Sequence, residues 1–283
     1  MNNKIGIIRY PGSNCDIDTS RYFGADSFYI WHNCQDISIL DTLKLIVIPG
    51  GFAFGDRKYE KATDNYKLDP GIMALDSPVS KIIFAASKRN IPIIGICNGF
   101  QILTKMGLLP GELLENNSGK FCSRYVGCTI KSGNISRYLS LPIANQFGRY
   151  AISEQEYNKI EKNGQIFLYY TDYENGSYKN IAGVCDETKT VFGLMPHPER
   201  NLHKIKSGDT DYFRDFLDKN IFNKKGNNRE IFHKKVNELF KSEHISYKST
   251  RKYLKNLYTK NKNIVQGPGE NAGIIDLGEG YWL

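Results

Sequence analysis

The chain has 283 residues, 40% hydrophobic and 24% charged, which is enough for one sizeable α/β domain and a smaller addition. No apolar run approaches membrane-spanning length, and the N-terminus lacks a signal-peptide pattern. The six cysteines form no C-x-x-C pair, so neither a zinc site nor a disulfide framework is indicated, and a reducing, cytoplasmic location is expected.

The net charge of +8 is unevenly placed along the chain. Residues 1–202 carry 22 lysines and arginines against 20 acidic residues, whereas residues 203–283 carry 16 against 10. The lysines of this basic tail are spread among Asn, Ser and Glu without a recognisable binding module. We therefore expect neither a nucleic-acid partner nor a membrane partner.

Apolar runs alternate with helical patterns in the first half of the chain, which is typical of a parallel α/β sheet. The expected strands are 4–9, 28–31, 43–48 and 91–96, and the expected helices are 16–23 and 78–89. The turn at 11–14 lacks the Walker pattern and is interpreted as structural, with Cys15 as a packed small side chain. Residues 57–76 are interpreted as a long surface excursion, with an active-site flap as its alternative use.

The strand at 91–96 runs into Gly95-Ile96-Cys97-Asn98-Gly99, and a helical pattern follows. Glycines two residues to either side of a nucleophile allow the strained strand-to-helix turn of a nucleophile elbow. A helix N-terminus favours the thiolate of Cys97, and the Asn98 N–H is placed to stabilise an oxyanion. A buried cysteine in a glycine-rich turn is the alternative for this motif alone.

A second glycine-rich loop, Pro49-Gly50-Gly51-Phe52, follows the strand at 43–48. Ligands of α/β folds bind at this end of the strands, and the loop could supply a second oxyanion donor. Taken alone, a simple βα turn is the better interpretation.

The second half of the chain predicts strands at 124–130, 166–170, 181–185 and 190–195, and a helix at 154–162. The last strand runs into Met195-Pro196-His197-Pro198-Glu199. His197 and Glu199 lie two apart in a proline-stiffened, extended segment, so both side chains can project to one side. A cysteine nucleophile needs a base and an orienting acceptor, which this pair can provide.

Residues 4–202 resemble class I glutamine amidotransferases, and within them the glutaminase subunits of phosphoribosylformylglycinamidine synthase. The motifs that carry the resemblance are Pro11 to Asp16, Pro49 to Phe52 with Gly55-Asp56, Gly95 to Leu103, Gly107 to Gly111, Asn175-Gly176-Ser177, Ile181-Ala182-Gly183 and Met195 to Arg200. The resemblance implies a flavodoxin-like, doubly wound, mostly parallel sheet flanked by helices. It also implies Cys97 as the nucleophile, His197 as the general acid/base and Glu199 as its orienter.

The resemblance further implies an oxyanion hole built from the N–H groups of Gly51 or Phe52 and of Asn98. Gln101, one helical turn after Cys97, is expected to help hold glutamine. No metal and no cofactor are expected on this chain. The expected partners are a synthetase subunit, which uses ATP and Mg²⁺ to amidate formylglycinamide ribonucleotide in purine biosynthesis, and a small third subunit.

Two segments depart from the family pattern. Family members often carry Ala-His-Gly-Glu-Gly where this chain has Ala144-Asn145-Gln146-Phe147-Gly148. The stretch 57–76 replaces a shorter family segment. We expect the first departure to affect partner coupling or substrate contacts rather than hydrolysis.

The chain is expected to divide into a glutaminase domain, 1–222, and a basic, partly helical or disordered extension, 223–283. Stretches 242–249 and 265–273 resemble the beginning of the synthetase subunit, with His244 and Tyr247 as vestiges of a catalytic histidine and an ATP contact. The hypothesis is a fusion cut short, and a docking extension is the alternative. Helical patterns cover 209–220 and 230–241, and residues 250–283 are expected to be poorly ordered.

Two other functions compete with the glutaminase. A stand-alone Cys-His-Glu hydrolase or peptidase would share the elbow, but Gln101 and the subfamily motifs argue against it. A degenerate, non-catalytic scaffold would fit the shortened tail and the altered segment 145–147. The intact Cys97, His197 and Glu199 argue against the scaffold.

Overall fold

A computed structural model of the protein describes residues 4–53, 71–132, 135–203, 209–222, 264–266, 274–278 and 281–282. The chain divides into two units, Met1–Asn227 and Asn228–Leu283. The domain boundary expected after residue 222 stays a prediction.

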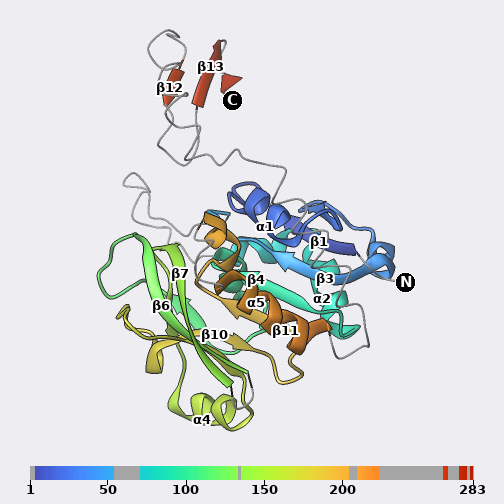
Figure 1. Ribbon diagram of the computed structural model, residues 1–283. Coiled ribbons are helices and arrows are strands. Elements are labelled where there is room, and N and C mark those ends of the chain that lie inside the picture. The colour runs from blue at the N-terminus through green and yellow to red at the C-terminus, as the bar shows by residue number, and fades with distance from the viewer. Residues whose placement is uncertain are drawn as a thin grey trace. The chain divides into compact units, whose positions relative to one another are not determined.

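A nine-stranded sheet in the order β2-β1-β3-β4-β11-β10-β9-β6-β7 forms the centre of the first unit (Figure 1). Its strands are β1 (Lys4–Arg9), β2 (Ser27–Trp31), β3 (Leu43–Ile48), β4 (Ile93–Ile96), β6 (Cys122–Ser132), β7 (Ile135–Asn145), β9 (Ile166–Tyr170), β10 (Ile181–Cys185) and β11 (Val191–Leu194). Neighbours from β2 to β11 are parallel, and neighbours from β11 to β7 are antiparallel. The expected doubly wound α/β fold is confirmed.

Helices flank the sheet because the parallel strands are apolar on both faces and must be covered on each. All four residues of β4 are buried, as are the last four of β3. The helices are α1 (Asp16–Phe23), α2 (Ser80–Lys88), α3 (Asn98–Lys105), α4 (Glu154–Lys162) and α5 (Asp209–Leu217), with a π-helical turn η5 (Asp218–Phe222) after the last. Arg214 fastens α5 by donating from Nη2 to the carbonyl oxygen of Tyr22 at 2.9 Å.

The antiparallel half contains elements that the sequence pattern did not predict. Strand β7 has eleven residues and includes Pro142, whose missing N–H argues against a central strand. It is tolerated because β7 is the last strand in the sheet order and pairs with β6 alone. A separate two-stranded sheet joins β5 (Glu112–Leu114) to β8 (Arg149–Ala151).

The excursion predicted at 57–76 lies mostly outside the described residues. Its end does not: Gly71 is buried, and Ala74, in the 3-10 helix η2 (Ile72–Asp76), is fully buried. The surface interpretation was therefore wrong for this end, which packs against α3.

The second unit contains three short antiparallel strands, β12 (Ile264–Gln266), β13 (Ile274–Gly278) and β14 (Tyr281–Trp282). They pair with one another, and the poor order expected for residues 250–283 stays a prediction. The helix expected at 230–241, and His244 and Tyr247, lie outside the described residues.

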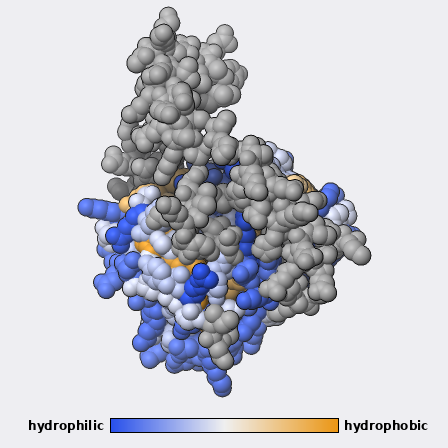
Figure 2. All heavy atoms as spheres, in the orientation of Figure 1, coloured by the Kyte–Doolittle hydropathy of each residue, from blue (hydrophilic) through white to orange (hydrophobic). Residues whose placement is uncertain are grey.

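Membrane-spanning helices are absent from the part of the chain that the structure describes. On the face drawn in Figure 2, hydrophilic residues cover most of the described surface and apolar residues form only small spots.

Candidate active site

The elbow predicted around Cys97 has the strained geometry that its sequence indicates. Cys97 stands between β4 and α3 with φ 53° and ψ −107°, a left-handed backbone that a side chain rarely adopts. Its backbone N–H donates to the carbonyl oxygen of Leu194 on β11 at 2.7 Å, which anchors the turn to the sheet. Such an outlier, held by its surroundings, is typical of a functional site.

The two glycines of the elbow are needed for close approach, while the strain falls on the cysteine itself. A Cβ added to Gly99 would lie 2.0 Å from the backbone oxygen of Ile48 on β3. A Cβ on Gly95 would lie 2.5 Å from the carbonyl oxygen of Gly99. Absence of both side chains lets α3 pack directly on the strand ends.

His197 and Glu199 form a buried pair beside the elbow, since β11 runs parallel to β4 and both strands end at the same edge. His197 Nδ1 lies 2.7 Å from Glu199 Oε1, and the two side chains are 1% and 0% exposed. The expected extended segment was wrong, because Glu199 lies in the 3-10 helix η4 (Pro198–His203). The expected projection to one side is confirmed by the hydrogen bond.

The His197 pKa reflects two opposing effects. Burial lowers it, but the carboxylate of Glu199 and the neighbouring Cys97 and Cys15 raise it more, so the pKa lies well above its usual 6.5. Glu199 thus stabilises the imidazolium form. His197 Nε2 and Glu199 Oε2 have no hydrogen-bond partner among the described residues.

Cys97 and His197 both flank Gly50. A Cβ on Gly50 would lie 2.5 Å from His197 Cε1 and 3.3 Å from Cys97 Cβ. The Cys97 Sγ lies 3.8 Å from the carbonyl oxygen of Ala144 on β7, and the residue is 1% exposed. The structure therefore brings the three predicted triad residues together.

The N–H groups predicted to form the oxyanion hole differ in whether they already donate a hydrogen bond. Phe52 donates its N–H to the carbonyl oxygen of Gly12 at 2.8 Å, so this group is engaged in holding the two βα loops together. Gly51 has φ 145°, and a Cβ there would lie 2.5 Å from the backbone of Asn14 and Gly12. Asn98, the first residue of α3, has no acceptor for its N–H within the helix. The candidates are therefore Gly51 and Asn98.

Both polar atoms of the Gln101 side-chain amide form hydrogen bonds. Its Nε2 donates to the carbonyl oxygen of Phe147 at 2.7 Å, and its Oε1 accepts from Asn98 Nδ2 at 2.8 Å. The side chain is buried and connects α3 to the segment that follows β7. Its predicted contact with glutamine stays a prediction.

A buried amide network holds the segment 144–148, where the chain departs from the family pattern. Asn116 Nδ2 donates to the backbone and side-chain oxygens of Asn145, both at 3.2 Å. Asn175 Nδ2 donates to Asn116 Oδ1 at 3.2 Å and to the Gly148 oxygen at 2.9 Å. The Asn175-Gly176-Ser177 motif thus supports this segment, and Ser177 Oγ accepts from the N–H of Tyr150 at 3.0 Å.

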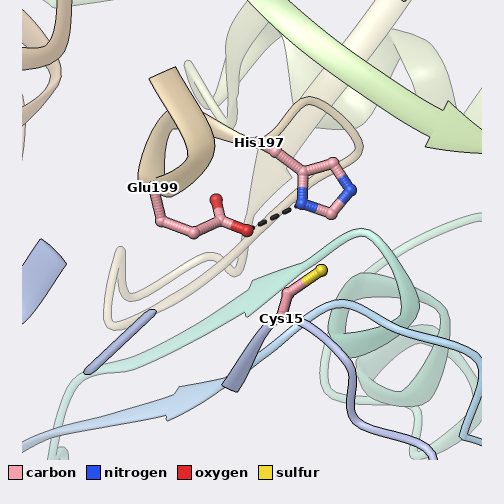
Figure 3. Close-up of side chains that lie close together, drawn as sticks. All are labelled: Cys15, His197 and Glu199. Atoms are coloured by element: carbon pink, nitrogen blue, oxygen red, sulfur yellow. Dashed lines mark hydrogen bonds and ion pairs between the residues drawn. The ribbon is translucent and has the colours of Figure 1, made fainter. Parts of the chain in front are cut away.

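Cys15 is a site residue that the sequence interpretation missed. It is buried at 6% exposure, as expected of a packed side chain, but it packs against the His197–Glu199 pair (Figure 3). One ligand atom from each of these three residues lies within 4.8 Å of the others. The available signal was its place after β1, because the loops after parallel strands share one edge of the sheet.

Comparisons with known proteins match most of the chain to one family. Residues 2–237 match the model of the CobB/CobQ-like glutamine amidotransferase domain. The PurQ subunit of phosphoribosylformylglycinamidine synthase from Helicobacter hepaticus is 42% identical over 212 residues, which are 71% of this chain and 90% of the relative. The PurQ subunit from Zymomonas mobilis is 37% identical over 221 residues, 74% and 95% of the two chains.

The solved structure of PurLQS from Thermotoga maritima contains a similar chain. The TM-score is 0.64 at 34% sequence identity, and the match covers 77% of this chain and 99% of that one. The similarity thus extends over the whole of the matched chain in that structure.

Proposed function

The chain belongs to the glutamine amidotransferase family, among the PurQ subunits of phosphoribosylformylglycinamidine synthase, and we propose on this premise that it hydrolyses glutamine to glutamate and ammonia. One observation carries the proposal: a strained Cys97 at a helix N-terminus lies beside a buried His197–Glu199 pair. This arrangement has the parts that nucleophilic catalysis on an amide requires.

In the proposed reaction the Cys97 thiolate attacks the side-chain carbonyl carbon of glutamine. The N–H groups of Asn98 and Gly51 stabilise the tetrahedral oxyanion. The imidazolium of His197 gives its proton to the departing nitrogen, and the C–N bond breaks to release ammonia and leave a glutamyl thioester. Water, deprotonated by His197, then attacks the thioester and releases glutamate and the thiolate.

The product ammonia goes to a partner in this proposal. A synthetase subunit uses it, with ATP and Mg²⁺, to convert formylglycinamide ribonucleotide to formylglycinamidine ribonucleotide, and a small third subunit completes the complex. Support comes from the relatives, which are subunits of a synthase, and from the PurLQS structure, which contains the similar chain. This chain itself binds no cofactor in the proposal.

Stretches 242–249 and 265–273 of the extension keep their proposed kinship with the beginning of a synthetase subunit. His244 and Tyr247 match, in this hypothesis, a catalytic histidine and an ATP contact of that subunit. Docking of the extension on the partner is the alternative.

Glutamate release from glutamine tests the proposed function. We expect release by the chain alone or, at a higher rate, after addition of a synthetase and third subunit from a close relative. Ammonia should appear as formylglycinamidine ribonucleotide when the substrate and ATP are present. A chain that cleaves peptides and leaves glutamine intact in every mixture would contradict the proposal and favour the stand-alone hydrolase.

Replacing Glu199 with glutamine should lower kcat for glutamate release by about 100-fold or more. The amide can still accept a hydrogen bond from Nδ1, but it cannot stabilise the imidazolium by charge. Glu187→Gln is the matched control, because its carboxylate is exposed and lies 3.9 Å from Lys159. Equal kcat values in the two variants would exclude the orienting role of Glu199.

A further inference from the structure

Cys15, His197 and Glu199 make a cluster that the proposed hydrolysis uses only in part. His197 and Glu199 act on Cys97 in that reaction, whereas the thiol of Cys15 has no step in it. The three side chains converge from two elements that are far apart in the sequence, the loop before α1 and the segment after β11 (Figure 3). All three residues are buried, and their ligand atoms lie within 4.8 Å of one another.

A second observation points to a ligand. Within the cluster, Glu199 Oε2 has no hydrogen-bond partner among the described residues, and its side chain is 0% exposed. Buried polar atoms without partners are rare, because each loses its hydration without compensation. An electron-pair acceptor placed among Cys15, His197 and Glu199 would satisfy this oxygen.

The donor set selects among cations. A thiolate sulfur, an imidazole nitrogen and a carboxylate oxygen suit zinc, whereas calcium and magnesium prefer oxygen ligands alone. Thiolate and carboxylate together neutralise a divalent ion, which a buried site requires. The neighbouring cation, Arg200, has Nε 3.5 Å from Asp18 Oδ2, so its own charge is partly balanced.

The geometry needs only side-chain adjustment to bind zinc. Metal bonds of about 2.0–2.3 Å in a tetrahedron separate the ligand atoms by roughly 3.3–3.6 Å. The Nδ1–Oε1 distance of 2.7 Å must widen, and separations of up to 4.8 Å must shorten. Rotation of Cys15 and Glu199 about their side-chain bonds can supply such changes.

We propose that Cys15, His197 and Glu199 form an inhibitory binding site for zinc or a similar thiophilic divalent cation. Zinc displaces the thiol proton of Cys15 and the Nδ1 proton of the His197 imidazolium, and both protons pass to solvent. It then binds the thiolate, the neutral imidazole and the Glu199 carboxylate, with a fourth position left open. Metal binding does not depend on the proposed function. Inhibition does depend on it, because His197 held by zinc cannot exchange a proton with Cys97.

Cobalt(II), a spectroscopic substitute for zinc, tests the binding directly. The full chain, reduced and metal-free, is titrated with cobalt, and a near-ultraviolet sulfur-to-cobalt charge-transfer band reports a thiolate ligand. We expect a stoichiometric band that zinc displaces. Cys15→Ser should weaken cobalt binding at least about tenfold and remove the band.

Two further variants identify the thiol. Cys34→Ser leaves the same number of thiols as Cys15→Ser and should keep the band, because Cys34 lies outside the cluster. Cys97→Ser should keep it as well. A band that persists in Cys15→Ser, or that disappears in Cys97→Ser, would overturn the proposed ligand set.

A measurement on the unaltered chain covers the case in which Cys15→Ser does not fold. Slow alkylation followed by peptide mass spectrometry, with and without zinc, reports the protection of each cysteine. Zinc should protect Cys15 and leave the alkylation of Cys34 unchanged. Equal alkylation of Cys15 in both conditions would overturn the proposal, and glutamate release measured in parallel shows separately whether bound zinc inhibits.

Discussion

Replacement of Cys97 with alanine is expected to reduce glutamate release by at least about 10⁴-fold, whether or not a partner synthetase is present. The covalent glutamyl thioester cannot form without the sulfur. The oxyanion donors alone accelerate glutamine hydrolysis far less than the complete triad does. Alanine keeps the Cβ, so the elbow and its contacts with Leu194 and Gly50 should persist. The rate of glutamate formation measures the effect.

The control for this variant is Cys34→Ala, which removes a thiol away from the elbow and should retain the activity. Added ammonia separates chemistry from assembly: a complex containing Cys97→Ala should still convert formylglycinamide ribonucleotide when ammonia is supplied. Glutaminase activity retained by Cys97→Ala would assign the nucleophile to another residue.

Replacement of Gly99 with alanine is expected to destabilise the folded state by about 3 kcal/mol or more and to remove the activity. The new Cβ would lie 2.0 Å from the carbonyl oxygen of Ile48. Ile48 belongs to a buried strand, so moving its backbone would disrupt packing on both faces of the sheet. Helix α3 would have to shift away from β3, taking Cys97 with it. Urea unfolding of the purified chain measures the change.

Gly107→Ala is the matched control for this steric effect. Gly107 follows the C-terminus of α3 with φ 68°, and a Cβ there meets no atom within 4 Å among the described residues. It should therefore cost only about 1 kcal/mol, from backbone conformation alone. Equal losses of stability for Gly99→Ala and Gly107→Ala would show that close packing of the elbow on β3 is not what requires Gly99.

The triad was predictable because its signals are local. Gly95 and Gly99 around Cys97 mark a strand-to-helix turn, and His197 with Glu199 follows the last strand two residues apart. Each motif can be recognised from a few consecutive residues. The end of each parallel strand lies at the same edge of the sheet, so the sequence order alone was enough to place the motifs near one another.

The oxyanion donors and Gln101 were harder to predict, because their hydrogen bonds go to remote loops. Phe52 donates to Gly12, and Gln101 donates to the Phe147 oxygen after β7. That strand itself was missed because Pro142 argues against a strand, although apolar residues alternate on either side of it. Its register with β6 depends on pairing across a hairpin and not on local preference.

The sequence by itself determined the parallel strands, their helices, the elbow and the His197–Glu199 pair, because apolar runs, glycines and helix ends act over short distances. Only the tertiary structure decided the antiparallel pairing of the later strands, the presence of β7, the hydrogen bonds of Phe52 and Gln101 to remote loops, and the position of Cys15 against His197. Those features come from strand order and loop packing, in which residues far apart in the chain fill one buried volume and satisfy each other's polar groups.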